Sequence, residues 1–208
     1  MILAIGDSHV ISFHPRVVEF CPVTMFPNVV KTDDITTCWL GPVTAWNFHK
    51  RINMVEEVRK SVGFSSNDAL VLVAGEIDCR CHIVKQARLQ GKTIGEVARQ
   101  CAAKMFGTCL SAHSMTFWAI PSFGKEDSQA TSPYRAIGSE EERMEACRSY
   151  NEEMGRLSKE SNINFVSLWD DVVKEGHPDE TRFLDGTHLV PFWASPRFRE
   201  KCLRAKDK

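Results

Sequence analysis

The sequence predicts an α/β protein: a flavodoxin-like three-layer α/β/α sandwich around a mostly parallel, five-stranded sheet. Two observations predict this fold. Apolar runs of strand length alternate along the chain with longer segments of helical periodicity. The run at 69–74 is apolar without a break, as in a parallel strand covered on both faces. The length of 208 residues suits one domain of ordinary size, so we expect a single domain over residues 1–208.

The expected strands are short apolar or β-branched runs at 2–5, 17–25, 69–74, 115–120 and 163–169. The expected helices lie at 42–60, at 93–109, from 139 to about 158, and after Pro196. Two of them begin with a capping box, Thr93 with Glu96 and Ser139 with Glu142. Right-handed crossovers between these elements give the predicted sandwich. The segment 122–138 has no periodicity, and it is either a lid or a surface loop without a role.

The composition excludes several classes of protein. Apolar residues make up 43% of the chain and charged residues 25%, which rules out disorder, collagen and a coiled coil. The net charge of -1 gives no support for a nucleic acid or an anionic membrane as partner. No signal peptide or membrane-spanning run stands out, so we expect a cytoplasmic protein whose eight cysteines are reduced thiols. The oligomeric state stays open.

Residues able to form a catalytic trio follow the predicted strands. Ser8 comes just after the first strand, and Asp185 and His188 come after the last one, three residues apart. In an open parallel sheet, ligands bind beyond the carboxyl ends of the strands. A serine hydroxyl needs an adjacent base to become a nucleophile, and a carboxylate orients that base. We therefore expect these three side chains to meet at one edge of the sheet.

Four blocks occur in an order that resembles the SGNH (GDSL-type) hydrolase superfamily over nearly the whole chain: Gly6-Asp7-Ser8, Gly41, the block at Gly75, and Asp185-x-x-His188. The resemblance implies that Ser8 is the nucleophile and a backbone oxyanion donor, and that Gly41 supplies a second amide. It implies that His188 is the general base and that Asp185 orients it. The implied activity is a serine esterase acting on a small ester such as an O-acetylated sugar, with no metal or organic cofactor.

The third block departs from the family's Gly-x-Asn-Asp, because it contains Gly75, Glu76, Ile77 and Asp78. Ile77 cannot donate the hydrogen bond of the family's asparagine, and losing one oxyanion donor costs about a hundredfold in rate or more. Arg80 is our candidate replacement, for the oxyanion or for an anionic substrate group. The alternative for Arg80 is a structural ion pair. Two further hypotheses therefore stay open: an acyltransferase with the same triad, and a non-catalytic relative that binds a glycan or a protein.

Other residues have a structural alternative to a functional role. Ser8 could cap the first helix, His188 could be a surface histidine and Gly41 a loop glycine before a helix. Asp7 is interpreted as a cap or turn residue, and His9 as either a substrate contact or an exposed residue. The spacing of Cys79, Cys81 and His82 does not fit a zinc site, which favours buried thiols. Five aromatic residues belong to the core or line an apolar or sugar-stacking pocket, with Phe192 and Trp193 the best candidates: Trp39, Trp46, Phe123, Phe192 and Trp193.

Overall fold

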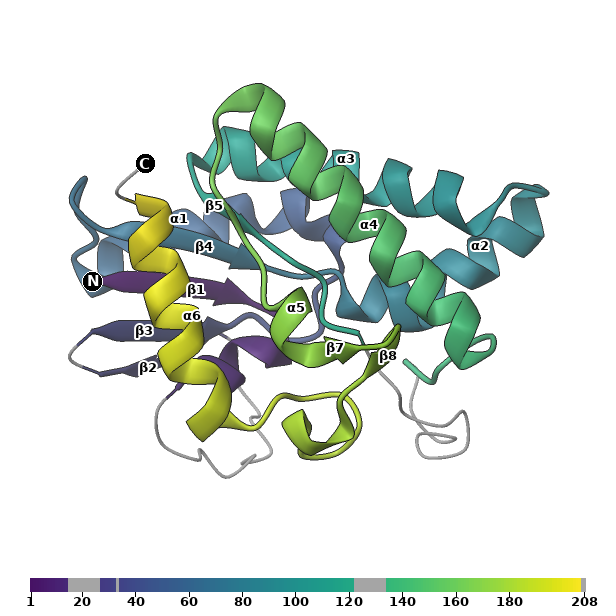
Figure 1. Cartoon of the computed structure of the whole chain (residues 1–208). Helices are drawn as coiled ribbons and strands as arrows, with labels where there is room; N and C mark the ends of the chain where they lie inside the picture. The colour runs from purple at the N-terminus through teal and green to yellow at the C-terminus, as the bar shows by residue number, and fades with distance from the viewer. Residues whose placement is uncertain (15–26, 33, 122–133, 207–208) are drawn as a thin grey trace.

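A six-stranded sheet forms the centre of the molecule (Figure 1). The computed structural model describes residues 1–14, 27–32, 34–121 and 134–206. The strands are β1 (Ile2–Gly6), β2 (Asn28–Lys31), β3 (Ile35–Trp39), β4 (Ala69–Val73), β5 (Met115–Phe117) and β6 (Phe165–Val166), in the order β2-β3-β1-β4-β5-β6. Five strands are parallel, and only the edge strand β2 of this sheet is antiparallel to its neighbour. The five parallel strands follow the flavodoxin order, which confirms the predicted fold.

The strand prediction needs one correction. The sheet has six strands and not five, because β2 and β3 were not predicted. Both are short, and the polar segment 31–34 separates their apolar residues, so neither gives a clear period of two. The strand predicted at 17–25 lies outside the described residues.

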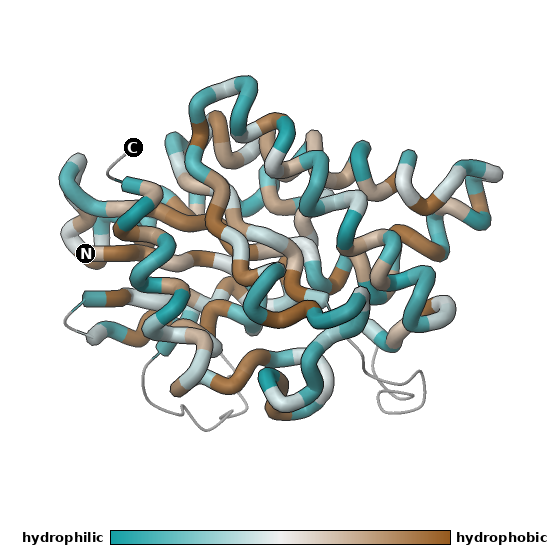
Figure 2. Tube along the Cα trace, viewed as in Figure 1, coloured by the Kyte–Doolittle hydropathy of each residue, from teal (hydrophilic) through white to brown (hydrophobic). Residues whose placement is uncertain are grey.

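The central strands β1, β4 and β5 are buried on both faces, whereas the edge strand β2 is only partly buried. In β1, Leu3 and Ile5 pack on one side of the sheet, and Ile2 and Ala4 on the other. The first side is covered by α1 (Ile52–Val62), α3 (Ile94–Ala112) and α4 (Glu140–Ser161), and the second by η1 (Ser8–Phe13), α5 (Trp169–Val172) and α6 (Pro191–Lys206). Figure 2 shows the resulting hydrophobic interior as brown segments between more hydrophilic helices.

The capping boxes predicted for α3 and α4 are confirmed. The hydroxyls of Thr93 and Ser139 each accept a hydrogen bond from the backbone N–H of the glutamate three residues later, and that glutamate bonds back to the cap. The helix expected at 42–60 is instead a 3₁₀ segment, η2 (Ala45–Arg51), followed by α1. The last helix begins at Pro191, five residues before Pro196. A π-helical turn (Asp78–His82) and α2 (Ile83–Gln90) were not predicted.

The carboxyl ends of the central strands lie level with one another, toward the right in Figure 1. Gly6 at the end of β1 pairs with Trp39 of β3 and with Val73 of β4. The segments that leave these strands therefore start side by side. A small hairpin, β7 (Val173–Lys174) and β8 (His177–Pro178), and the 3₁₀ segment η5 (Glu180–Arg182) precede the segment that carries Asp185 and His188.

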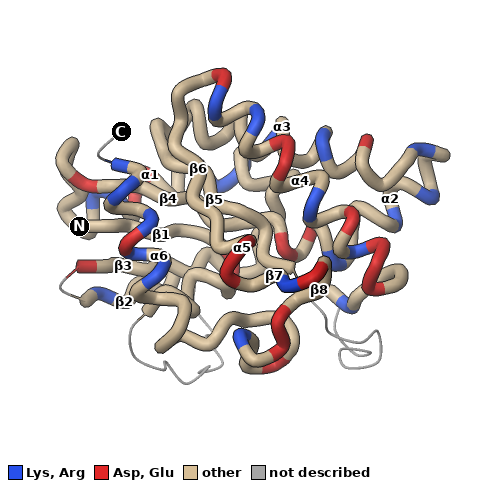
Figure 3. Tube along the Cα trace, in the orientation of Figure 1, with Lys and Arg blue, Asp and Glu red and all other residues tan. Residues whose placement is uncertain are grey.

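Acidic and basic residues are interspersed along α4 and α6 (Figure 3), in keeping with the balanced composition. Within the described ranges, no helix combines the length and the apolar character that crossing a membrane requires.

Candidate active site

Ser8 is placed by the end of strand β1. Gly6 comes so close to β4 that a Cβ atom there would lie 1.8 Å from the carbonyl oxygen of Val73, which excludes any other residue. Asp7 then caps η1 by accepting a hydrogen bond from the backbone N–H of His9 at 2.9 Å. Asp7 is thus the cap residue that the sequence indicated, and Ser8 is the first residue of the 3₁₀ helix, with its side chain partly exposed.

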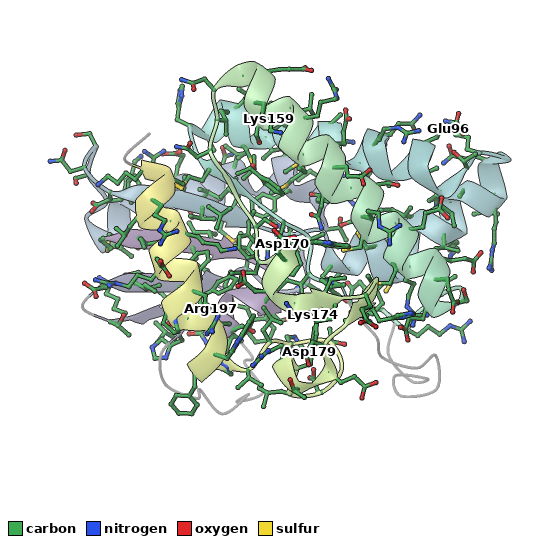
Figure 4. The ribbon with its side chains drawn as sticks, viewed as in Figure 1. Glu96, Lys159, Asp170, Lys174, Asp179 and Arg197 are labelled. Carbon is green, nitrogen blue, oxygen red and sulfur yellow. The ribbon has the colours of Figure 1, made fainter. Side chains whose placement is uncertain are left out.

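Asp185 and His188 lie on one turn, which Asp185 itself organises. Its Oδ1 accepts hydrogen bonds from the backbone N–H groups of Thr187 at 3.0 Å and His188 at 2.8 Å, while its Oδ2 lies 2.8 Å from Nδ1 of His188. Burial alone would raise the pKa of Asp185, but these contacts outweigh burial and hold the pKa well below its usual range. In sequence the turn lies between Asp179 and Arg197, whose labels stand in the lower half of the molecule in Figure 4.

The two segments, 180 residues apart, meet at the Ser8 hydroxyl. Its Oγ lies 2.8 Å from Nε2 of His188. Because the Asp185 carboxylate accepts a hydrogen bond from Nδ1–H, Nε2 carries the lone pair that can accept the proton of the Ser8 hydroxyl; this tautomer is assigned from the hydrogen-bond network. The structure therefore brings together the three residues that the sequence singled out, in the order hydroxyl, imidazole, carboxylate.

His9 is not exposed, contrary to one of the two expectations for it, because its ring is enclosed beneath His188. The ring centroids of His9 and His188 are 4.8 Å apart, and the planes are inclined by 26°. Nδ1 of His9 lies 3.0 Å from Oδ1 of Asp7, and Nε2 lies 3.1 Å from the carbonyl oxygen of Thr187. Sequence patterns missed these contacts, since only the fold brings Thr187 to His9.

Gly41 lies at the same edge of the sheet as Ser8. It follows β3 by two residues, has a φ of 87°, and comes directly after Leu40, whose N–H donates to the carbonyl of Gly6 at 2.8 Å. The loop that follows Gly41 is held by Asp78, which accepts a hydrogen bond from the N–H of Ala45 at 2.6 Å. Burial raises the pKa of Asp78 to about 7, although the backbone N–H groups of Ala45 and Trp46 act in the opposite direction. The oxyanion role of Gly41 stays a prediction.

The third block begins with a glycine that the packing requires. Gly75 has a φ of 125°, and a Cβ atom there would lie 3.0 Å from Cβ of Ala119 and from Cζ of Tyr150. Ile77 is buried and offers no side-chain donor. The family's asparagine thus has no direct substitute at its own position.

Arg80 is engaged in the ion pair that was its structural alternative. Its Nε donates to Oε1 of Glu76 at 2.5 Å and its Nη2 to Oε2 at 3.1 Å, and its Nη1 donates to the carbonyl of Tyr134. Burial alone would lower the pKa of Arg80, but the charge and hydrogen bonds of Glu76 raise it, so the guanidinium is charged. The contribution of Arg80 to an oxyanion hole stays a prediction.

The cysteines next to the third block are buried thiols. Cys79 and Cys81 are enclosed, and the seven cysteines within the described ranges are all buried and unpaired by disulfides. In the same part of the chain, no group of three or more His, Cys, Asp or Glu residues is arranged to hold a metal ion. Cys21 lies outside the described residues.

The aromatic candidates separate into different environments. Phe192 is 68% exposed, and the ring of Trp193 is flanked by the guanidinium groups of Arg182 and Arg197, 5.1 and 4.7 Å from its centroid. Trp46 instead lines a pocket of about 290 Å³, with polar side chains such as Asp78 and His82, which contains neither Ser8 nor His188. Trp39 is partly buried, and Phe123 lies outside the described residues.

Several solved structures superpose on nearly the whole of this chain. A GDSL-like lipase from Bacteroides thetaiotaomicron superposes with a TM-score of 0.57 at 16% identity, over 99% of this chain and 87% of that one. A carbohydrate acetylesterase from Sinorhizobium meliloti gives 0.56 at 14% identity, over 99% and 98%. A catalytic mutant of an acetylxylan esterase from Geobacillus stearothermophilus gives 0.53 at 14%, over 98% and 92%.

The chain has the SGNH hydrolase fold. At these identities the likeness concerns the fold alone. No protein-family model matches the sequence, and no curated protein does. Within the SGNH fold, the chain has a serine, an aspartate and a histidine in hydrogen-bond contact at the carboxyl edge of the sheet, together with a third block that lacks its asparagine.

Proposed function

We propose that this protein is a serine-dependent esterase that acts on a small ester such as an O-acetylated sugar. One observation carries the proposal: the two successive 2.8 Å contacts from Ser8 Oγ to His188 and from His188 to Asp185. A serine hydroxyl aligned with an imidazole, which is itself oriented by a carboxylate, is the arrangement that makes an alcohol nucleophilic at neutral pH.

Acylation follows from this geometry. Ser8 Oγ attacks the ester carbonyl carbon while its proton passes to Nε2 of His188, so the imidazolium forms beside the Asp185 carboxylate that stabilises it. When the tetrahedral intermediate collapses, the bond to the leaving alcohol breaks, and His188 returns the proton to the alcohol oxygen. The acyl group is then held on Ser8.

Deacylation uses the same groups with water as nucleophile. His188 accepts a proton from water as the water oxygen attacks the acyl carbon, and it then protonates Ser8 Oγ as the acyl bond breaks. The products are a carboxylic acid and the free enzyme, so the cycle is balanced without a cofactor.

Negative charge on the carbonyl oxygen would be met by backbone amides of Ser8 and Gly41. The Ser8 N–H belongs to the first turn of η1, where helices leave amides without an intrahelical acceptor. With Ile77 in place of the asparagine, these amides act without the family's third donor, and we expect a slower enzyme than one with a complete oxyanion hole.

The substrate class is supported by the structural relatives and by the edge of the site. Two of those relatives are a carbohydrate acetylesterase and an acetylxylan esterase. Phe192 follows His188 closely and is exposed, and an aromatic ring of this kind can stack on a sugar.

Ile77 favours a second candidate function, a protein that binds a glycan or another protein through the same cleft without turnover. An acyltransferase with the same triad is distinguished from an esterase by its acceptor, since added alcohol would then outcompete water for the acyl group. The labelling and turnover measurements below separate an esterase from a protein that only binds.

The test is covalent labelling combined with an ester panel. A fluorophosphonate probe should label the wild type at Ser8 and leave Ser8→Ala unlabelled, while Ser111→Ala, a change at an exposed serine on α3, labels like the wild type. Acetyl esters, including acetylated xylooligosaccharides, should be hydrolysed by the wild type and not by Ser8→Ala. Folded wild type that neither labels nor hydrolyses any ester of the panel would overturn the proposal.

A further inference from the structure

The residue directly after the nucleophile is a fully enclosed histidine. His9 is 1% exposed, and both of its ring nitrogens face acceptors: Oδ1 of Asp7 at 3.0 Å and the carbonyl oxygen of Thr187 at 3.1 Å. A carbonyl oxygen only accepts hydrogen bonds, and so does an ionised carboxylate. Both contacts are satisfied at once only when both ring nitrogens carry a proton. The geometry therefore selects the imidazolium form of His9.

The charges around His9 stabilise that form. Burial alone would lower the pKa of His9, but Asp7, Glu76 and the Thr187 carbonyl outweigh burial and raise the pKa to about 9. Among the described residues, His188 stacks on the ring, and Glu76 is itself paired with Arg80. His9 is consequently charged at neutral pH.

His9 also connects the two segments that must meet for the reaction. Asp7 and His9 flank Ser8 at the end of β1, whereas Thr187 immediately precedes His188. The segments are joined twice, once between Ser8 and His188 and once between His9 and Thr187. The stacking of His9 against His188 further limits how the His188 ring can tilt.

We propose that His9 is a positioning residue: it ties the Thr187 carbonyl to the Asp7 carboxylate and thereby holds His188 over Ser8. This inference rests on the proposed esterase function. His9 itself touches neither the ester nor the proton in transit, so its effect passes through the placement of His188.

This tie, the two hydrogen bonds from the His9 ring to Asp7 and to the Thr187 carbonyl, depends on pH in a defined direction. It is complete well below pH 9, where His9 keeps both ring protons, and it is lost as the pH rises through about 9. The neutral ring has one N–H for two buried acceptors, so either Asp7 or Thr187 loses its partner. We therefore expect kcat to fall on the alkaline side near pH 9, independently of substrate binding.

Two substitutions at His9 test the tie. His9→Phe keeps a stacking ring but removes both donors, whereas the side-chain amide of His9→Gln can donate to Thr187 from near the position of Nε2. Displacing a catalytic group by about 1 Å costs on the order of a hundredfold in rate. We expect His9→Phe to lower kcat for an acetyl ester by about that factor with little change in KM. His9→Gln should recover most of kcat and lack the alkaline fall.

A matched control and a second measurement complete the design. His177→Phe, at an exposed histidine of β8, should behave like the wild type in kcat, KM and pH profile. NMR of the wild type with labelled histidine should show His9 with two protonated ring nitrogens at pH 7 and a titration near pH 9. That spectrum does not require any variant to fold.

The failures of the two proposals are distinguishable. If the wild type hydrolyses esters and folded His9→Phe matches it in kcat and pH profile, the positioning role is overturned and the esterase stands. If the wild type shows no Ser8-dependent chemistry, the proposed function fails. The NMR spectrum then tests separately whether His9 donates hydrogen bonds to both Asp7 and Thr187. A His9 ring that is neutral at pH 7 overturns the tie, and a doubly protonated ring supports it.

Discussion

Two aspartate–histidine pairs lie one above the other at the carboxyl edge of the sheet. The contact between Asp185 and His188 measures 2.8 Å, and the one between Asp7 and His9 measures 3.0 Å. The first pair is open to solvent, with 51% of the Asp185 side chain exposed, whereas the second is almost completely buried. Residue types and distances are nearly the same, so neither explains why only one pair is suited to act as a base.

The partner of the second ring nitrogen makes the difference. Nε2 of His188 faces the Ser8 hydroxyl, which can give up a proton, while Nε2 of His9 faces the Thr187 carbonyl, which cannot. One imidazole therefore has a lone pair ready for a proton, and the other already holds two protons. Each carboxylate fixes one ring nitrogen of its histidine, and the group at the other nitrogen then decides whether the imidazole can accept a proton.

The largest effect is expected from neutralising the carboxylate of the exposed pair. Asp185→Asn keeps the shape of the side chain but favours the wrong tautomer of His188, and such a change lowers kcat by about 10⁴-fold in serine hydrolases. Steady-state hydrolysis of an acetyl ester measures it. An Asp185→Asn protein within about tenfold of the wild type would mean that Asp185 does not orient the base.

The same substitution in the buried pair should have a smaller and different effect. Asp7→Asn retains the helix cap, since asparagine caps as well as aspartate, but removes the main charge that raises the pKa of His9. We expect the alkaline fall in kcat to move from near pH 9 toward neutrality by about one unit or more, with a loss of about tenfold or less at pH 7. A pH–rate profile measures both. An unchanged alkaline limb would mean that Asp7 and His9 do not cause the alkaline fall in kcat.

The smallest effect concerns stability. Because the pKa of His9 is raised in the folded state, its contribution to stability is complete below about pH 6.5, the unfolded value, and is lost as the pH rises through about 9. The expected loss is on the order of 3 kcal/mol at most. Urea unfolding of the wild type at pH 6, 7.5 and 9 should show this slope, and His9→Gln should lack it. Equal slopes in the two proteins would contradict a charged His9.

The sequence predicted features that depend on neighbouring residues along the chain. The capping boxes at Thr93 and Ser139 are local, and so are the apolar runs that became β1 and β4. The meeting of Ser8 with His188 could be predicted too, because the carboxyl ends of parallel strands share one edge.

What could not be predicted depends on tertiary burial. Each of these two residues has one local partner, Asp7 for His9 and Glu76 for Arg80, but local spacing does not show whether the side chain is buried. Their second partners come from the fold: Thr187 lies 178 residues from His9, and Tyr134 lies 54 residues from Arg80. The short strands β2 and β3 were missed because their pairing with each other and with β1, not their pattern, defines them.

The two glycines at the base of the site limit how its specificity can be altered. A Cβ atom at Gly6 would overlap the carbonyl of Val73, and Gly75 has a φ of 125° with the side chains of Ala119 and Tyr150 close by, so neither position can take another residue without strain. Leu184 and Phe192, by contrast, are 55% and 68% exposed on the segments around the histidine turn. Redesign toward a bulkier or smaller acyl group should therefore begin at this rim, where side chains can be exchanged without separating the strands.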